Sequence, residues 1–252
     1  MTHGRVAVVT GAARGIGRAT AQRLGRDGHR VVLLDVLAKP LEETVEALRA
    51  DGLDAVGFTV DLAEEAQLAA LPARMGSLLD EVAVLVNNAG ISPKRNGVKL
   101  PALEIGLEEW ERVLRVNLTA PFRMAQLCLP AMLRQRWGRI VNISSRGGRS
   151  VAVAGGTHYT ATKAGLLGLT RTLAREFAAD GVTVNSIAPG RIQTPMTDGS
   201  TPEVLARVRA AIPVGRFGTP EEVAAMVAYL VSEEAGFVTG ACFDINGGAL
   251  MI

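Results

Sequence analysis

Residues 10–17 read Thr-Gly-Ala-Ala-Arg-Gly-Ile-Gly, and this short stretch decides the fold. It follows directly on an apolar run at residues 6–9 and opens a segment with helical character. Glycines at such a turn let the backbone bend tightly and approach a pyrophosphate, whose charge is stabilised at the helix N-terminus. Asp35, at the end of the next apolar run, places a carboxylate where it could accept hydrogen bonds from a ribose. The pattern predicts a dinucleotide-binding strand–turn–helix unit, with a purely structural glycine turn as the alternative.

Outward from this turn, short apolar runs rich in β-branched residues alternate with longer helical patterns. Uninterrupted apolar runs are typical of parallel strands that are covered on both faces. We predict strands at residues 6–9, 31–34, 55–60, 82–86, 140–143 and 182–187, with a seventh near 242–245. The alternation predicts an α/β fold, a single doubly wound Rossmann-type domain over residues 1–252, with a seven-stranded, mostly parallel sheet and helices on both faces.

Helix signals lie between these runs. Thr219 precedes a proline and two glutamates, which predicts an N-cap with a capping box. Long apolar helices are predicted at 108–135 and 159–178. The segments 91–106 and 189–202 are rich in proline and glycine, and we expect them to be irregular and to cover a substrate.

Composition excludes several classes of protein. The 27 basic and 25 acidic residues are interspersed, and aromatic residues make up 4% of the chain, so nothing indicates a nucleic-acid partner. The strand-like run that starts at residue six leaves no room for a signal peptide, and no apolar stretch approaches the roughly 18 residues of a membrane span. We expect a cytoplasmic protein without a membrane partner.

Cysteine and histidine are scarce. Cys128 and Cys242 lie far apart in apolar surroundings, which favours two reduced core thiols over a disulfide. None of the three histidines is spaced like a metal-ligand pair. We therefore predict no metal site.

Further motifs follow the predicted strands in a fixed order. They are Asn-Asn-Ala-Gly at 87–90, Val-Asn-Leu at 116–118, Asn-Ile-Ser-Ser at 142–145, Tyr-Thr-Ala-Thr-Lys at 159–163 and Pro-Gly-Arg-Ile-Gln-Thr at 189–194. With the TGxxxGxG spacing of the first turn, the set resembles the classical short-chain dehydrogenase/reductase family over residues 5–248.

Tyr159 and Lys163 are four residues apart on a predicted helix, so their side chains share a face. A free phenol titrates near pH ~10, and a neighbouring ammonium favours the phenolate and lowers that pKa. This pair suits general acid–base catalysis, with a core tyrosine and a surface lysine as the alternative. Adjacent helical residues point about 100° apart, so His158 is expected at the surface or in a pocket wall, away from Tyr159.

The resemblance implies four catalytic residues, namely Asn117, Ser145, Tyr159 and Lys163. Ser145 would donate a hydrogen bond to a substrate carbonyl oxygen, with Ser144 as the alternative. The segment from Ser145 to Tyr159 is one residue longer than the commonest family spacing, so strict counting would place Arg146 at the serine position. Asn117 would lie at a helix irregularity that holds a water in a proton relay.

The resemblance also implies where a nicotinamide cofactor binds. Asp61 would bind the adenine amino group, and Ile192 and Thr194 the carboxamide. The full expected set is Gly11, Arg14, Gly15, Ile16, Gly17, Asp35, Asp61, Leu62, Asn88, Ala89, Gly90, Tyr159, Lys163, Pro189, Gly190, Ile192 and Thr194.

Two residues point to different nicotinamide cofactors. Asp35 can accept both ribose hydroxyl hydrogens of NAD and would repel the 2′-phosphate of NADP. Arg14 could favour that phosphate, but Val36 and Leu37 stand where NADP-dependent relatives often place a second basic residue. We expect NAD(H) to be preferred, with NADP(H) possible.

The expected activity is that of an NAD(P)-dependent oxidoreductase that interconverts a ketone and a secondary alcohol. The chain is similar to 3-oxoacyl-[acyl-carrier-protein] reductases, whose basic carrier-binding positions are matched by Arg136 and Arg175. Both arginines could equally be ordinary solvated helix charges. The alternatives are a polyol or sugar dehydrogenase of the same family, a nucleotide-sugar epimerase, and a non-catalytic NAD(P)-sensing protein.

The resemblance also implies a homotetramer with D2 symmetry, in which the long apolar helices would bury their remaining hydrophobic positions.

Overall fold

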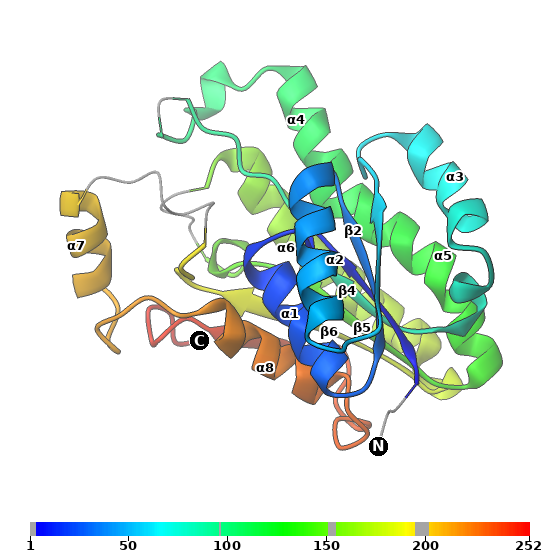
Figure 1. Ribbon diagram of the computed structural model, residues 1–252. Helices are drawn as coiled ribbons and strands as arrows, with labels where there is room; N and C mark the ends of the chain where they lie inside the picture. The colour runs from blue at the N-terminus through cyan, green and yellow to red at the C-terminus, as the bar shows by residue number, and fades with distance from the viewer. Residues whose placement is uncertain (1–3, 96, 151–154, 195–201) are drawn as a thin grey trace.

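A seven-stranded parallel sheet forms the centre of the computed structural model, which describes residues 4–95, 97–150, 155–194 and 202–252 (Figure 1). The strand order is β3-β2-β1-β4-β5-β6-β7, and each neighbouring pair is parallel. The strands are β1 (Val6–Thr10), β2 (Arg30–Asp35), β3 (Ala55–Thr59), β4 (Val82–Asn87), β5 (Gly138–Ile143), β6 (Val182–Pro189) and β7 (Cys242–Ile245). This confirms the predicted doubly wound α/β fold, whereas the single domain over 1–252 stays a prediction.

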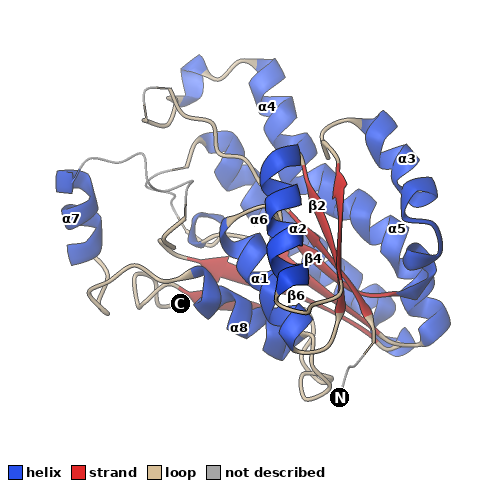
Figure 2. Cartoon of the chain, in the orientation of Figure 1, coloured by secondary structure: helices blue, strands red, loops and turns tan. Residues whose placement is uncertain are grey.

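Helices cover both faces of the sheet (Figure 2). One face packs against α1 (Gly15–Arg26), α2 (Ala38–Ala50) and α8 (Pro220–Leu230). The other packs against α3 (Glu65–Met75), α5 (Ala120–Gln135) and α6 (Thr157–Phe177). Two further helices are α4 (Leu107–Leu114), which packs on α6, and α7 (Pro202–Ala210), which lies apart from the sheet (Figure 1).

The alternation of side chains along each strand produces two separate cores. Successive strand residues point to opposite faces. Val6 and Val8 accordingly join the core beneath α3, α5 and α6, while Ala7 and Val9 join the core beneath α1, α2 and α8. All four side chains are fully buried, which explains why the sequence shows an unbroken apolar run there.

Helix boundaries follow local chemistry where the sequence supplies it. The Thr219 hydroxyl accepts a hydrogen bond from the Glu222 N–H, and the Glu222 carboxylate accepts one from the Thr219 N–H at 2.8 Å, which confirms the capping box. The predicted helix over 108–135 is divided, because a π-helical turn at Arg115–Thr119 separates α4 from α5.

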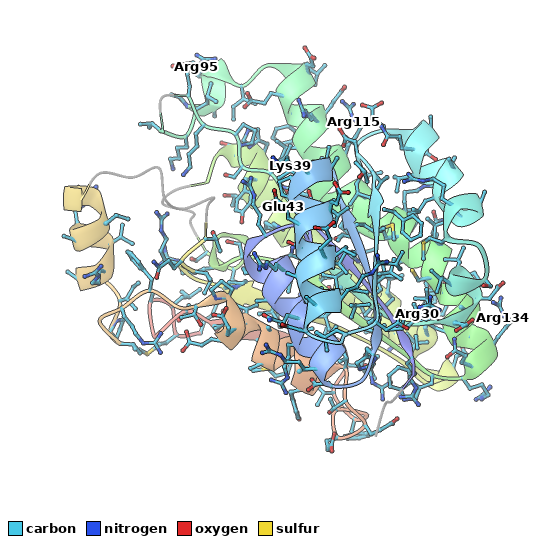
Figure 3. The ribbon with its side chains drawn as sticks, in the orientation of Figure 1. Arg30, Lys39, Glu43, Arg95, Arg115 and Arg134 are labelled. Carbon is cyan, nitrogen blue, oxygen red and sulfur yellow. The ribbon has the colours of Figure 1, made fainter. Side chains whose placement is uncertain are left out.

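The two segments expected to be irregular differ from each other. Among its described residues, segment 91–106 carries a 3₁₀ turn at Ala102–Glu104 and an isolated β-bridge between Arg95 and Val98. Segment 189–202 continues into α7, which the sequence reading did not anticipate, and its residues 195–201 lie outside the described residues. Charged side chains such as Arg30, Arg95 and Arg134 extend from the periphery (Figure 3). Within the described ranges, no helix is long and apolar enough to cross a bilayer.

Candidate active site

A cavity of about 400 Å³ brings together nearly all the residues expected to bind a cofactor or act on a substrate. It lies where β1, β2, β4, β5 and β6 end, as the crevice rule for open parallel sheets requires. The expected residues that line it are Gly11, Arg14, Gly15, Ile16, Asp35, Asp61, Leu62, Asn88, Ala89, Gly90, Ser145, Tyr159, Lys163, Pro189, Gly190, Ile192 and Thr194. Gly17 and Asn117 are buried and do not line it.

The glycine-rich turn is held against the segment that follows β4. Gly11 has φ of 63°, and a Cβ there would lie 2.8 Å from Ala89 Cα. A Cβ on Gly17 would lie 2.1 Å from the Gly11 carbonyl oxygen. The first turn of α1 can therefore pack this closely against Gly11 only because residue 17 has no side chain. Asn88 Nδ2 donates to the carbonyl oxygens of Thr10 and Gly11 at 2.9 Å. These contacts keep the turn open toward the cavity, a cradle that fits a pyrophosphate.

Asp35 is already part of the framework of this turn. One carboxylate oxygen accepts from the Ala13 N–H at 2.9 Å, and the other accepts from the Leu37 N–H at 3.0 Å. A carboxylate has about four acceptor sites, so both oxygens retain capacity for a ribose. Arg14, which lines the same cavity, is exposed. Asp35 therefore combines a structural role with a position suited to binding a cofactor.

Of the catalytic candidates, Ser145 follows β5, and Tyr159 and Lys163 lie on α6. Lys163 Nζ donates to the Ile143 carbonyl oxygen at 2.7 Å and lies 5.8 Å from the centroid of the Tyr159 ring. Ser145 Oγ accepts from the Gly147 N–H at 3.1 Å, so its own hydrogen can be donated to the Tyr159 oxygen or to a substrate. The buried Ser144 hydroxyl instead donates to the Lys163 carbonyl oxygen at 2.7 Å. The geometry therefore distinguishes the two serines.

Burial controls the protonation of the tyrosine and the lysine. It raises the pKa of Tyr159, and a hydrogen bond with the Ser145 side chain opposes that shift. Burial also lowers the pKa of Lys163 to about 8. The predicted net lowering of the Tyr159 pKa beside Lys163 is not found, because desolvation raises that pKa and the opposing contribution comes from Ser145. The phenol is therefore protonated at neutral pH and poised to donate.

We expect the rate of ketone reduction to fall as pH rises through about 8. Below that pH Lys163 carries the charge that favours proton release by Tyr159, and above it that charge is lost, while the raised pKa of Tyr159 keeps the phenol protonated. The measurement is the pH profile of kcat at saturating cofactor. Lys163→Arg, whose guanidinium stays charged, should lack this falling limb in its residual activity, and a wild-type profile that stays flat above pH 8 would contradict the assignment.

Asn117 lies in the π-helical turn, as the resemblance implied, and is fully buried. Its side chain accepts from the Ile91 N–H at 2.8 Å and donates to the Ile91 carbonyl oxygen at 2.9 Å and to Thr162 Oγ1 at 3.2 Å. A Cβ on Gly90 would stand 3.4 Å from Asn117 Oδ1 and 3.3 Å from Lys163 Nζ. Asn117 thus ties the segment after β4 to α6, immediately behind Lys163.

Further residues line the cavity that the sequence had not assigned to the site, namely Val36, Leu37, Val60, Ile91, Arg112, Val116 and Ile143. Ser144, the alternative to Ser145, lines it too. Arg112 and Val116 are four residues apart, and Val116 directly precedes Asn117, a spacing that could have indicated them. The prediction of His158 at the surface or in a pocket wall is wrong, because its side chain is fully buried and does not line this cavity. Its Nε2 lies 2.9 Å from Glu109 Oε1.

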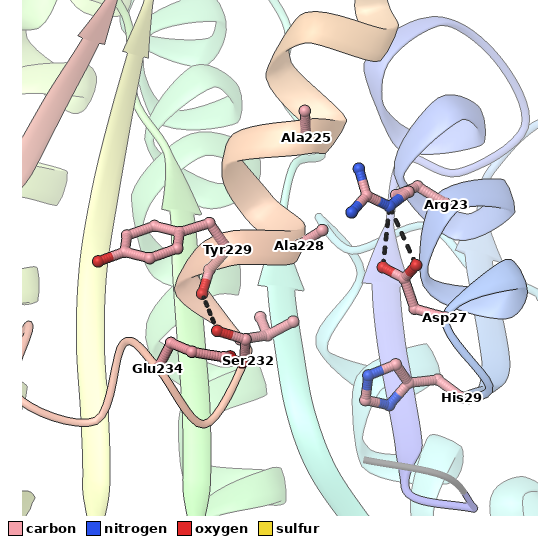
Figure 4. A pocket seen from close by; sticks show the side chains of 9 residues that line it. Arg23, Asp27, His29, Ala225, Ala228, Tyr229, Ser232 and Glu234 are labelled. Carbon is pink, nitrogen blue, oxygen red and sulfur yellow. Dashed lines mark hydrogen bonds and ion pairs between the residues drawn. The ribbon is translucent and has the colours of Figure 1, made fainter. Parts of the chain in front are cut away.

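A second cavity, of about 360 Å³, lies between α1 and α8 and contains none of the expected site residues (Figure 4). Arg23 is paired with Asp27, and the Ser232 hydroxyl donates to the Tyr229 carbonyl oxygen at 2.8 Å. Its polar groups are thus largely satisfied by one another, and the candidate site is the first cavity.

Comparisons with known proteins show which proteins this chain resembles over nearly its whole length. A family model described as enoyl-(acyl carrier protein) reductase matches residues 11–249. The chain is 41% identical over 246 residues to a 3-oxoacyl-[acyl-carrier-protein] reductase of Aquifex aeolicus, a match that covers 97% of both chains.

The chain is also similar to solved structures of reductases and dehydrogenases, one with bound NAD and one with bound NADP. A 3-oxoacyl-[acyl-carrier protein] reductase of Brucella melitensis with bound NAD is 39% identical, with a TM-score of 0.91, and the match covers 100% of this chain and 93% of that one. A structure described as an NAD(P)-dependent gluconate 5-dehydrogenase of Beutenbergia cavernae, with bound NADP, is 37% identical, with a TM-score of 0.90 and coverage of 98% and 97%.

Proposed function

This chain belongs to the short-chain dehydrogenase/reductase family of NAD(P)-dependent oxidoreductases, and we propose that it reduces a 3-oxoacyl thioester to the 3-hydroxyacyl form. The observation that carries the proposal is the cavity in which the glycine-rich turn meets Ser145, Tyr159 and Lys163. A nucleotide cradle and a proton donor in one crevice suit the addition of a hydride and a proton across a carbonyl.

The chain's own residues would hold the carbonyl oxygen and supply the proton. The bound nicotinamide supplies the hydride. Ser145 donates a hydrogen bond to the carbonyl oxygen and stabilises the charge that develops on it. Tyr159 passes its phenolic proton to that oxygen, which gives the secondary alcohol and leaves a phenolate that solvent reprotonates. The Lys163 ammonium lowers the cost of that phenolate.

The 3-oxoacyl substrate is favoured by the relatives from Aquifex aeolicus and Brucella melitensis, both described as reductases of acyl groups on a carrier protein. Arg136 and Arg175 offer positive charge near the C-terminal ends of α5 and α6 for an acidic carrier. One nitrogen of the Arg136 guanidinium, Nη2, already donates to the Ala179 carbonyl oxygen at 3.3 Å. The Arg175 side chain is exposed. A sugar dehydrogenase is the second candidate, because the neighbour from Beutenbergia cavernae is described as one.

We expect kcat/KM for a 3-oxoacyl thioester to exceed that for 5-ketogluconate by about 10²-fold or more, measured by cofactor absorbance. A carrier-bound thioester and a short free thioester separate the two parts of the proposal. Arg175→Glu should raise KM for the carrier-bound substrate and leave the free thioester unchanged, since a charge on the interface rim acts on the carrier alone. A faster reaction with the sugar acid would favour the second candidate.

We further propose that NAD(H) is preferred over NADP(H), by about one to two orders of magnitude in kcat/KM, or about 1.4–2.7 kcal/mol. Asp35 supports this, because its carboxylate lines the cavity and would oppose a 2′-phosphate. Asp35→Asn keeps an acceptor for the Ala13 N–H while it removes the charge, so the preference should move toward NADP by about tenfold. Kinetics with both cofactors and one substrate check this, and an unmoved ratio would exclude Asp35 as the selector.

The homotetramer and the cytoplasmic location belong to the same proposal and rest on the sequence. Phe122 on α5, 42% exposed, is the kind of side chain that self-association would cover.

A further inference from the structure

We propose that His158 and Glu109 form a positioning pair that fixes the backbone of Tyr159, with two glycines that make room for it. The proposal rests on the function proposed above, in which Tyr159 donates the proton. His158 therefore acts through Tyr159 and does not touch the reacting atoms.

The imidazole of His158 supplies the acceptor that the first turn of α6 needs. The N–H groups of a first helical turn have no partner within the helix. The N-cap residue of α6 is Gly156, which has no side chain to offer. His158 Nδ1 accepts from the Tyr159 N–H at 2.8 Å. The cap is therefore placed on the residue that carries the phenol.

Glu109 holds the ring in the orientation that this cap requires. Because Nδ1 accepts from an N–H, the ring hydrogen is on Nε2, which donates to Glu109 Oε1 at 2.9 Å. Hydrogen bonds to a carboxylate are stronger and more directional than those between neutral groups. Glu109 lies in the first turn of α4, so the contact fixes the start of α6 against a second helix.

The carbonyl oxygen of Tyr159 is also bound by a side chain, and that side chain contacts the continuation of α4. Thr162 Oγ1 donates to the Tyr159 carbonyl oxygen at 2.8 Å and accepts from Asn117 Nδ2 at 3.2 Å. Asn117 lies in the π-helical turn that continues α4. Both backbone polar groups of Tyr159 are thus bound by side chains that α4 and its continuation hold in place.

Gly155 and Gly156 allow the two rings to pack this closely. A Cβ on Gly155 would lie 2.6 Å from Tyr159 Cδ1, and a Cβ on Gly156 would lie 2.6 Å from His158 Cε1. The φ of Gly156 is −69°, which any residue can adopt, so space rather than backbone conformation requires glycine there. The pair of glycines and the His158–Glu109 contact together define where the tyrosine ring can lie.

The test uses Glu109, which is only partly buried, so that its variants fold. Glu109→Ala should lower kcat by about tenfold, because a small displacement of a catalytic group has a large effect on rate. KM for cofactor and substrate should change by less than about twofold, and the solvent isotope effect on kcat should rise as proton transfer becomes slower. Glu109→Gln, which restores an acceptor for Nε2–H, should recover most of the rate. Glu108→Ala is the matched control from the same helical turn.

His158→Leu provides the second arm. It should lower kcat at least as much as Glu109→Ala, and combining the two should cost nothing more, since Glu109 acts through His158. A Glu109→Ala variant with the wild-type kcat and isotope effect would overturn the proposal, as would additive losses in the double variant. If Tyr159→Phe retains turnover, the proposed function fails; if Tyr159→Phe is inactive while Glu109→Ala is unaffected, this inference alone fails.

Discussion

Tyr159→Phe is expected to lower kcat by about 10³-fold while the nicotinamide cofactor still binds. The change removes only the phenolic oxygen and keeps the ring that lies against Gly155. The residues that would bind the cofactor come from β1, β2, β4 and β6 as well as α6, so the cradle survives. Steady-state kinetics give kcat, and a titration of cofactor fluorescence gives the dissociation constant.

Tyr229→Phe is the matched control, because the chain has two tyrosines and this one is 46% exposed on α8. It should leave kcat unchanged. Near wild-type turnover in Tyr159→Phe would refute the proton-donor role, and a loss of cofactor binding in that variant would mean that the ring, not the proton, had been tested.

Most of the fold could be predicted because parallel strands buried on both faces leave a plain signal. The run at residues 6–9 became β1 (Val6–Thr10), and the run at 182–187 became β6 (Val182–Pro189), with differences only at the strand ends. Strand ends are fixed by hydrogen bonds to neighbours, which local composition does not specify. Helix α7 was not predicted, since it lies apart from the sheet and its residues 205–210 are exposed or half-buried, so no buried face marks it in the sequence.

The cavity could be predicted only where a motif marks it. Gly11, Asn88 and Tyr159 belong to such motifs and line the cavity. Arg112 lines it with no motif of its own. Helical geometry predicted His158 at the surface or in a pocket wall, whereas the side chain is buried, binds the Tyr159 N–H and contacts Glu109, 49 residues earlier in the chain. This contact depends on how α4 packs against α6, and the residues next to His158 in the sequence do not indicate that packing.

The spacing between β5 and Tyr159 left open whether Ser144 or Ser145 supplies the catalytic hydroxyl. The hydrogen bonds of the two serines favour Ser145. Ser145 Oγ accepts from the Gly147 N–H, and its hydrogen can point into the cavity. Ser144 Oγ donates its one hydrogen to the Lys163 carbonyl oxygen. Arg146 starts a 3₁₀ turn, and its Nη1 donates to the Ala249 carbonyl oxygen at 3.4 Å. A guanidinium in that position replaces neither hydroxyl.

Ser145→Ala is therefore expected to lower kcat by about 10²-fold or more, as the loss of a donor to a developing oxyanion does. Ser144→Ala removes an intramolecular hydrogen bond instead, so it should lower the free energy of unfolding by about 1 kcal/mol and have the smaller effect on kcat. Thermal unfolding and steady-state kinetics on both variants separate the two roles. If Ser144→Ala proves the more damaging to kcat at equal stability, the catalytic register lies one residue earlier, because a hydroxyl already committed to the Lys163 carbonyl could matter more only by leaving that bond to reach the substrate.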